Sequence, residues 1–213
     1  GSVGKYAYGE KDCTAYCHMF AAGKVDFSNG ISLECRTDYP YGMSVKYDVT
    51  GSGRLAVRIP KWSRNYTLTV DGTEVTAAPE NGYVYVAVNG YTQVELLLDG
   101  TPRFVRASGR VPRLTGMTAL MRGPLVYCFE GADNGSVREL RIDRGVIPAV
   151  EKFDPDFLGG TTRLTAKAYR AADCDDLYSS KPEELTPCEA TAIPYYAWGN
   201  RGENEMRVWL NVK

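Results

Sequence analysis

Hydrophobic and polar residues alternate with a period of two along much of the chain. Leu55, Val57 and Ile59 alternate with polar or small residues, and a proline at position 60 ends the run. Such alternation is typical of β-strands with one buried face. Asp71-Gly72 and Asn89-Gly90 predict tight hairpin turns, because both central positions of a type I′ turn need positive φ. Similar alternating segments lie at 44–49, 66–70, 84–88 and 94–98.

The second half of the chain repeats this texture without repeating the sequence. A bend is expected at Arg122-Gly123-Pro124, and the polar, proline-containing residues 173–187 predict a loop. The 22 glycines and 11 prolines are spread throughout, and no window shows an apolar stripe at helical spacing for three turns. We therefore predict an all-β protein. Its further strands are expected at 117–121, 125–130, 140–142, 162–169, 188–193 and 206–212.

The spacing of the predicted strands also indicates how the chain is divided. Strands about ten residues apart, joined by tight turns, are typical of antiparallel sandwiches. The length of 213 residues suits two domains of about 100 residues each. We expect two antiparallel, jelly-roll-like β-sandwiches, over residues 1–106 and 107–203. Residues 204–213 either end the second sandwich or cross back to complete the first, and spacing leaves both open.

Charge and composition exclude some classes of partner. Lys and Arg total 25 and Asp and Glu total 26, so the formal charge of −1 argues against binding to nucleic acids or anionic membranes. Hydrophobic residues make up 44% and charged residues 24%, as in ordinary globular proteins. The apolar runs are too short for a transmembrane helix, and no signal peptide is expected.

The six cysteines and the single histidine give little support for a metal site. Cys13 and Cys17 are expected on one face of one strand, with His18 on the other. Sulfurs about 13 Å apart along a strand cannot share a zinc ion whose bonds to sulfur are roughly 2.3 Å. We expect reduced, mostly buried structural thiols, which favours the cytoplasm of a bacterium. His18 is expected at a strand surface or an interface.

Three segments carry a specific resemblance. They are residues 58–62 (RIPKW), 121–130 (MRGPLVYCFE) and 192–202 (AIPYYAWGNRG). In this order and spacing they resemble the C-terminal part of glycoside hydrolase family 127, which contains bacterial β-L-arabinofuranosidases. The resemblance covers the chain from about Tyr6 to Leu210. It implies a parent protein in which an (α/α)6 helical barrel precedes two β-sandwich domains.

The same resemblance implies that the chemistry lies outside this chain. In the family, a zinc-held cysteine thiolate is the nucleophile and a glutamate is the acid/base, all within the barrel. No adjacent cysteine pair occurs here, so no catalytic residue, metal ligand or cofactor is expected. The one dense acidic cluster is expected to be a solvated loop, since no histidine or aromatic floor accompanies it. Its members are Asp173, Asp175, Asp176, Glu183 and Glu184.

Aromatic side chains are the remaining candidates for a site. Tyr195, Tyr196 and Trp198 follow the rigid Pro194, and Trp62 follows another proline. Such rings form platforms for sugar stacking, or they pack in cores and domain interfaces. Both interpretations stay open, with packing or interdomain contact favoured. Exposure of the three rings at 195–198 would support binding, and burial would count against it.

These observations lead to three hypotheses. In the first, the chain is a non-catalytic accessory region that supports its own catalytic barrel, with homodimerisation as a further role. The second is a carbohydrate-binding module for arabinose-containing plant glycans. The third is a free-standing interaction protein of shared ancestry. The first also predicts an exposed apolar patch on the first sandwich or the segment from Tyr6 to Phe20.

Overall fold

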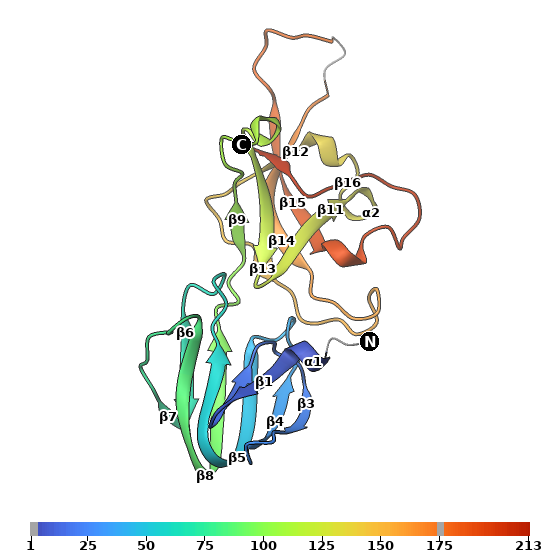
Figure 1. Ribbon diagram of the computed structural model, residues 1–213. Helices are drawn as coiled ribbons and strands as arrows, with labels where there is room; N and C mark the ends of the chain where they lie inside the picture. The colour runs from blue at the N-terminus through green and yellow to red at the C-terminus, as the bar shows by residue number, and fades with distance from the viewer. Residues whose placement is uncertain (1–3, 174–176) are drawn as a thin grey trace. The chain divides into compact units, whose positions relative to one another are not determined.

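The computed structural model describes residues 4–173 and 177–213 and is dominated by β-strands (Figure 1). Two short helices, α1 (Gly4–Ala7) and α2 (Gly131–Asn134), are four residues long each. The all-β prediction is therefore confirmed. The chain divides into two compact units between Gly100 and Thr101, a few residues before the boundary expected at 106.

The first unit is one eight-stranded sheet of mixed direction. Its central order is β1-β2-β5-β8-β6-β7, and β3 and β4 extend it from β5. Strand β2 runs parallel to β5, whereas the other pairings are antiparallel, so the expected purely antiparallel arrangement does not hold. The strands are β1 (Tyr8–Lys11), β2 (Thr14–Cys17), β3 (Gly23–Asp26), β4 (Ser32–Thr37), β5 (Ser44–Arg58), β6 (Tyr66–Val70), β7 (Thr73–Glu74) and β8 (Tyr83–Leu98).

Strands β5 and β8 pair along the whole length of β5, which corrects the prediction at Asn89-Gly90. That dipeptide lies inside β8 and pairs with Gly51 and Ser52 of β5 instead of forming a hairpin turn. Gly51 and Gly53 have φ of 135° and 149°, so glycine lets the strand change direction without ending. The other predicted turn, Asp71-Gly72, does join two paired strands, β6 and β7.

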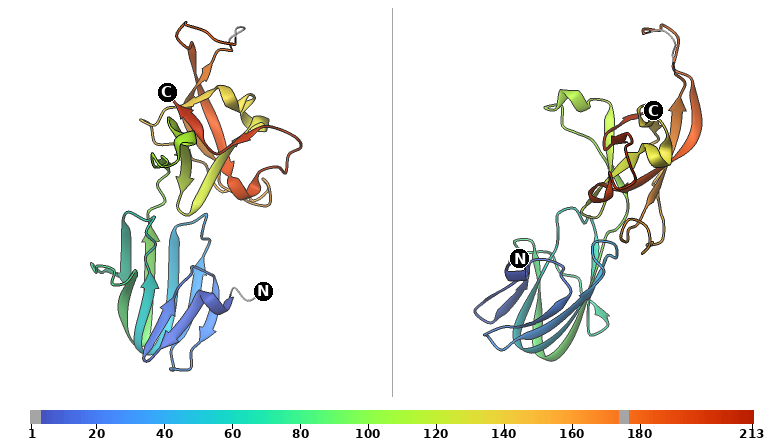
Figure 2. Two further views of the ribbon diagram at one scale, coloured as in Figure 1. Left: turned by 45° about the horizontal axis from the view of Figure 1, so that its top comes forward. Right: turned by 90° about the vertical axis from the view of Figure 1, so that its right-hand side faces the viewer.

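The sheet of the first unit surrounds its own core because β5 and β8 curve (Figure 2). Strand β4 pairs with the first half of β5 and β2 pairs with the second half. Tyr47 from the first half and Val57 from the second belong to one buried cluster, together with Cys17 of β2 and Cys35 of β4. Alternation with period two therefore places one face of both halves in the same interior.

The second unit is a nine-stranded mixed sheet. Its central order is β16-β11-β15-β14-β12-β17-β10-β9, with β13 paired to β14 and β10 also paired to β11. Only the β12–β17 pairing is parallel among the described strands. The strands are β9 (Arg103–Val105), β10 (Met117–Arg122), β11 (Leu125–Glu130), β12 (Leu140–Ile142), β13 (Ala149–Val150), β14 (Leu164–Ala171), β15 (Leu185–Pro194), β16 (Met206–Arg207) and β17 (Leu210–Val212).

The end of the chain belongs to the second unit. Strand β16 pairs with β11, and β17 pairs with β10 and β12. Leu210 lies in the core of this unit with Leu120, Tyr127 and Phe129. The alternative in which residues 204–213 return to the first sandwich therefore does not hold, because their hydrogen bonds and their buried leucine are used here.

The described cysteines are unpaired. Cys17, Cys35 and Cys128 are buried, Cys188 is half-buried, and Cys13 is exposed. Strand β2 begins at position 14, so Cys13 lies in the turn before it and not on the face expected from the sequence. The sixth cysteine, at position 174, lies outside the described residues. No helix in the described part of the chain is long and apolar enough to cross a membrane.

Replacing Gly53 with alanine tests the bend in β5. A Cβ at this position would lie 2.3 Å from the carbonyl oxygen of Cys13, and φ is also positive. We expect Gly53→Ala to lower the free energy of unfolding by about 3 kcal/mol or more, measured by urea denaturation. The matched control is Gly72→Ala, where φ is positive but the space is open, with an expected loss of about 1 kcal/mol. Equal losses would contradict the steric argument.

Thiol reactivity tests the burial of the cysteines. Burial raises the pKa of Cys128 to about 12, and burial raises the pKa of Cys17 and Cys35 above the ordinary value. A raised pKa leaves little thiolate near pH 8, so a disulfide reagent should modify the exposed Cys13 well before these three. In denaturant all should react together. Rapid modification of Cys128 in the folded protein would contradict the structure.

Candidate functional site

The aromatic segment at 195–198 leaves the second unit as a short 3-10 helix, η3 (Tyr195–Ala197), directly after β15. Tyr195, Tyr196 and Trp198 are 45%, 52% and 44% exposed. Ala197 is buried with Cys128 and Ile193, so this one small side chain anchors the turn and directs its aromatic neighbours outward. Exposure of all three rings is the condition under which the sequence favoured a binding role.

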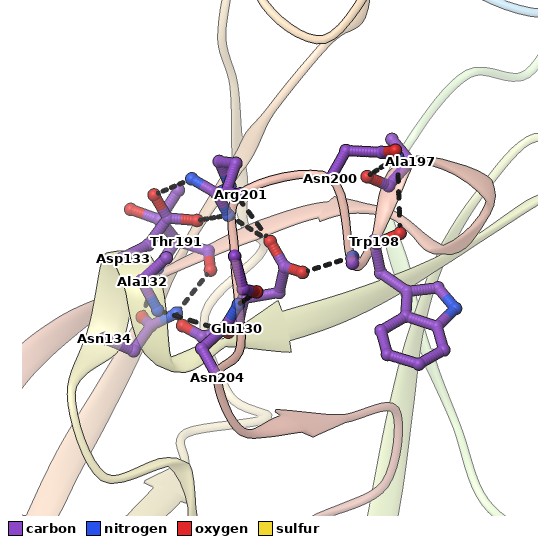
Figure 3. Close-up of polar contacts among 12 residues, drawn as sticks. Glu130, Ala132, Asp133, Asn134, Thr191, Ala197, Trp198, Asn200, Arg201 and Asn204 are labelled. Atoms are coloured by element: carbon purple, nitrogen blue, oxygen red, sulfur yellow. Dashed lines mark hydrogen bonds and ion pairs between the residues drawn. The ribbon is translucent and has the colours of Figure 1, made fainter.

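Two of these rings form a platform, defined here as Tyr195 and Trp198. Their centroids are 6.3 Å apart and their planes are inclined by 27°. The hydroxyl of Tyr196 is instead 3.3 Å from the Oγ1 of Thr161, which ties it to the chain before β14. The indole of Trp198 points away from the polar contacts behind the segment (Figure 3). The platform is therefore open on its ring side.

A buried ion pair holds the backbone behind this platform. Glu130, at the end of β11, is fully buried. Its Oε1 accepts a hydrogen bond of 2.8 Å from the backbone N–H of Gly199, and its Oε2 accepts one of 3.0 Å from the Nε of Arg201. Arg201 also donates two hydrogen bonds of 2.6 Å to Asp133 (Figure 3). One guanidinium thus joins two carboxylates.

The surroundings of this ion pair reinforce it. Hydrogen bonds to Asp133, and then to Glu130, raise the pKa of Arg201 above its ordinary value, so the guanidinium stays charged. The ring of Phe157 lies 5.3 Å from Arg201 and 4.7 Å from Arg163. Asn134 bridges α2 and β15, donating to the carbonyl of Thr191 and accepting from its N–H, both at 2.9 Å.

Trp62 is not part of the platform. It belongs to the first unit, is half-buried, and packs against that unit's core. Its ring stacks on Tyr39 with centroids 6.5 Å apart and planes inclined by 18°. The structure thus brings Tyr195, Tyr196 and Trp198 together and assigns Trp62 to packing.

The first unit presents a second surface, which we call the tyrosine face. It consists of Tyr16, His18, Arg54, Arg58, Tyr83 and Tyr85 on the outward side of β2, β5 and β8. Tyr16 stacks on His18 and meets the edges of Tyr83 and Tyr85. The guanidinium of Arg54 lies 5.3 Å from the ring centre of Tyr85.

His18 is fixed at one end of the tyrosine face. Its Nδ1 lies 2.8 Å from the hydroxyl of Tyr83. Burial and, secondarily, the charge of Arg58 lower its pKa, which favours a neutral ring. A Cβ at Gly9 would lie 2.8 Å from the Nε2 of His18, so glycine is required beside it. The histidine is therefore a surface residue in a packed aromatic cluster, as the sequence predicted.

Other candidates from the sequence do not assemble into a site. Glu183 forms an ion pair with Arg141, while Asp175 and Asp176 lie outside the described residues. Among residues 4–173 and 177–213, no three His, Cys, Asp or Glu side chains are grouped to hold a metal ion. The donor set present therefore does not fit the zinc implied by the family resemblance.

Replacing Glu130 tests whether the buried ion pair holds the segment. We expect Glu130→Ala to lower the free energy of unfolding by about 3 kcal/mol, because it strands part of a buried charge network. Glu130→Gln should cost less, since the amide oxygen can still accept from Gly199. The control is Lys24→Ala, which breaks the exposed pair with Glu34 and should cost under about 1 kcal/mol. Similar losses for Lys24→Ala and Glu130→Ala in urea denaturation would contradict this role.

Comparison with solved structures supports both units. A GH127 β-L-arabinofuranosidase from Geobacillus stearothermophilus T6 matches with a TM-score of 0.91 and 31% identity, covering 100% of this chain and 36% of that chain. A second structure, of a GH127 β-arabinofuranosidase, matches with a TM-score of 0.87 and 27% identity, covering 100% and 37%.

Comparison of sequences leads to the same family. The non-reducing end β-L-arabinofuranosidase of Bifidobacterium longum subsp. longum is 40% identical over 228 residues, covering 98% of this chain and 35% of the relative. The chain thus spans about a third of the length of these relatives. Residues 14–99 match the β-L-arabinofuranosidase GH127 middle domain, and residues 102–211 match the glycoside hydrolase family 127 C-terminal domain. The resemblance seen in three motifs is confirmed, and the chain belongs to glycoside hydrolase family 127.

Proposed function

We propose that this chain is the non-catalytic accessory region of a β-L-arabinofuranosidase-like glycoside hydrolase and that it supports an (α/α)6 catalytic barrel. The observation that carries this proposal is the coverage of the relatives. Nearly all of the chain aligns with them, yet it corresponds only to their middle and C-terminal domains and to about a third of their length. The sugar-cleaving machinery is placed in the remaining two thirds.

The tyrosine face is the surface that we assign to contact with the barrel. Strand pairing places Thr14, Arg54 and Ala87 in one row and Tyr16, Ala56 and Tyr85 in the next. The two rows thus bring tyrosine rings and an arginine to the surface and contain no acidic residue. Aromatic and arginine side chains are enriched in protein interfaces, and positive charge suits an acidic partner surface.

The start of the chain extends this contact surface. Tyr6 is 68% exposed and Met19 is also exposed, as predicted for the segment from Tyr6 to Phe20. Ala15 and Cys17 are buried, and Phe20 packs against the core, so only part of that segment is free to dock. This surface is flat and built on paired strands, which suits support of a neighbouring domain.

A chimera tests the accessory role. In it, this chain replaces the matched third of the Bifidobacterium longum relative, and hydrolysis of an aryl β-L-arabinofuranoside is measured. We expect the chimera to hydrolyse the substrate and the 213-residue chain alone to show no hydrolysis. The relative lacking that third should lose stability or activity. Hydrolysis by the chain alone, or full activity of the truncated relative, would overturn the proposal.

Charge reversal in the same chimera tests the tyrosine face. Arg54→Glu with Arg58→Glu should lower the melting temperature of the chimera by several degrees, because two interface charges become repulsive. The isolated chain should melt as before, since both side chains are exposed. The matched control is Lys61→Glu, another exposed reversal in the first unit. An unchanged chimera would show that this face does not meet the barrel.

Self-association and cellular location complete the proposal. A homodimer would use the same face if sedimentation of the isolated chain detects dimers that the two arginine reversals dissociate, and the barrel would then need another surface. We place the protein in the bacterial cytoplasm, because its described cysteines are unpaired and the named relatives come from bacteria. Fractionation of the source cells tests this location.

A further inference from the structure

The platform formed by Tyr195 and Trp198 lies beside a hollow with polar walls. The hollow measures about 600 Å³ and is lined by Trp198, Gly199, Gly202, Glu203 and Asn204. Its two glycines have φ of 78° and 86°, so the backbone turns closely around it without side chains to fill the space. An aromatic ring, an amide and a carboxylate therefore border one open volume.

The charges behind the hollow are already compensated. Arg201 is engaged by Glu130 and Asp133, so it offers no free positive charge to a ligand. Glu203 is exposed and leaves a negative charge at the rim. This balance disfavours anionic ligands, and nothing in it calls for a strongly cationic one.

The hydrogen-bonding groups at the rim suit hydroxyl groups. The Nδ2 of Asn204 donates to the carbonyl of Gly202 at 3.1 Å, and its Oδ1 lies at a long 3.4 Å from the N–H of Ala132. Each group retains hydrogen-bonding capacity, since an amide has two donors and two acceptor lone pairs. The Glu203 carboxylate adds acceptors only. A ligand with an apolar face and several hydroxyls matches both the rings and this rim.

We propose that Tyr195 and Trp198, together with Glu203 and Asn204, bind a neutral saccharide chain on the second unit. The sugar ring stacks on the platform through its C–H face, and its hydroxyls reach the rim of the hollow. This goes beyond the accessory role, because it requires no contact with the barrel and can be measured on this chain alone.

The support behind the platform favours a ligand site. Gly199 is fixed by the buried Glu130, and the Nδ2 of Asn200 donates to the carbonyls of Ala197 and Trp198 at 3.0 and 3.3 Å. The segment that carries the rings is therefore ordered before any ligand arrives, which lowers the entropic cost of binding. The tyrosine face differs, since its rings contact one another across a flat sheet.

Calorimetric titration tests the proposal. The 213-residue chain is titrated with L-arabinose, arabinotriose and maltotriose, and tryptophan fluorescence follows the same titrations. We expect saturable binding of at least one saccharide, stronger for the trisaccharide that is preferred. Trp198→Ala and Tyr195→Ala should each weaken binding roughly tenfold or more through loss of ring contact.

Control variants keep the outcome interpretable. Tyr178→Ala removes another highly exposed tyrosine of the same unit and should leave binding unchanged. Thermal melting of each variant should match the parent, because the truncated rings are exposed. Absence of saturation up to about 10 mM saccharide, or equal affinity for the parent and Trp198→Ala, would overturn the proposal. Neither result bears on the accessory role, which the chimera tests separately.

Discussion

The burial of one carboxylate, that of Glu130, sets the conformation of the most exposed segment of the second unit. A charge removed from water is costly unless it is paired and hydrogen-bonded. Here the partners are the guanidinium of Arg201 and the N–H of Gly199, both in the loop after η3. Satisfying Glu130 therefore requires that loop to turn back over the end of β11. The same turn leaves the rings of Tyr195 and Trp198 facing solvent.

The first unit depends on a comparable constraint of the backbone. One pair of long strands, β5 and β8, supplies residues to the whole core, and this is possible only if both strands bend without breaking their ladder. Glycine at positions 51 and 53 meets that condition next to backbone atoms that leave no room for a Cβ. The bend in turn lets β2 and β4 occupy successive halves of one strand edge.

Local patterns predicted the strands and their buried faces but not their partners. Val45, Tyr47, Leu55 and Val57 were assigned to alternating segments, and all four are buried. The dipeptide at 89–90 carries the same local signal as the turn at 71–72. Only its pairing with Gly51 and Ser52 makes it part of a strand, and this pairing joins residues far apart in sequence. The parallel pairings of β2 and β17 were hidden for the same reason.

The candidate site shows the same limit of sequence reasoning. The rings at 195–198 could be proposed from their residue types, because Pro194 and glycine flank them. Their support could not, since Glu130 and Arg201 lie 71 residues apart. Glu130 ends the motif at 121–130, and Arg201 lies near the end of the motif at 192–202. Two of the segments that carry the family resemblance are thus joined by one buried ion pair, which gives a physical reason for their occurrence together.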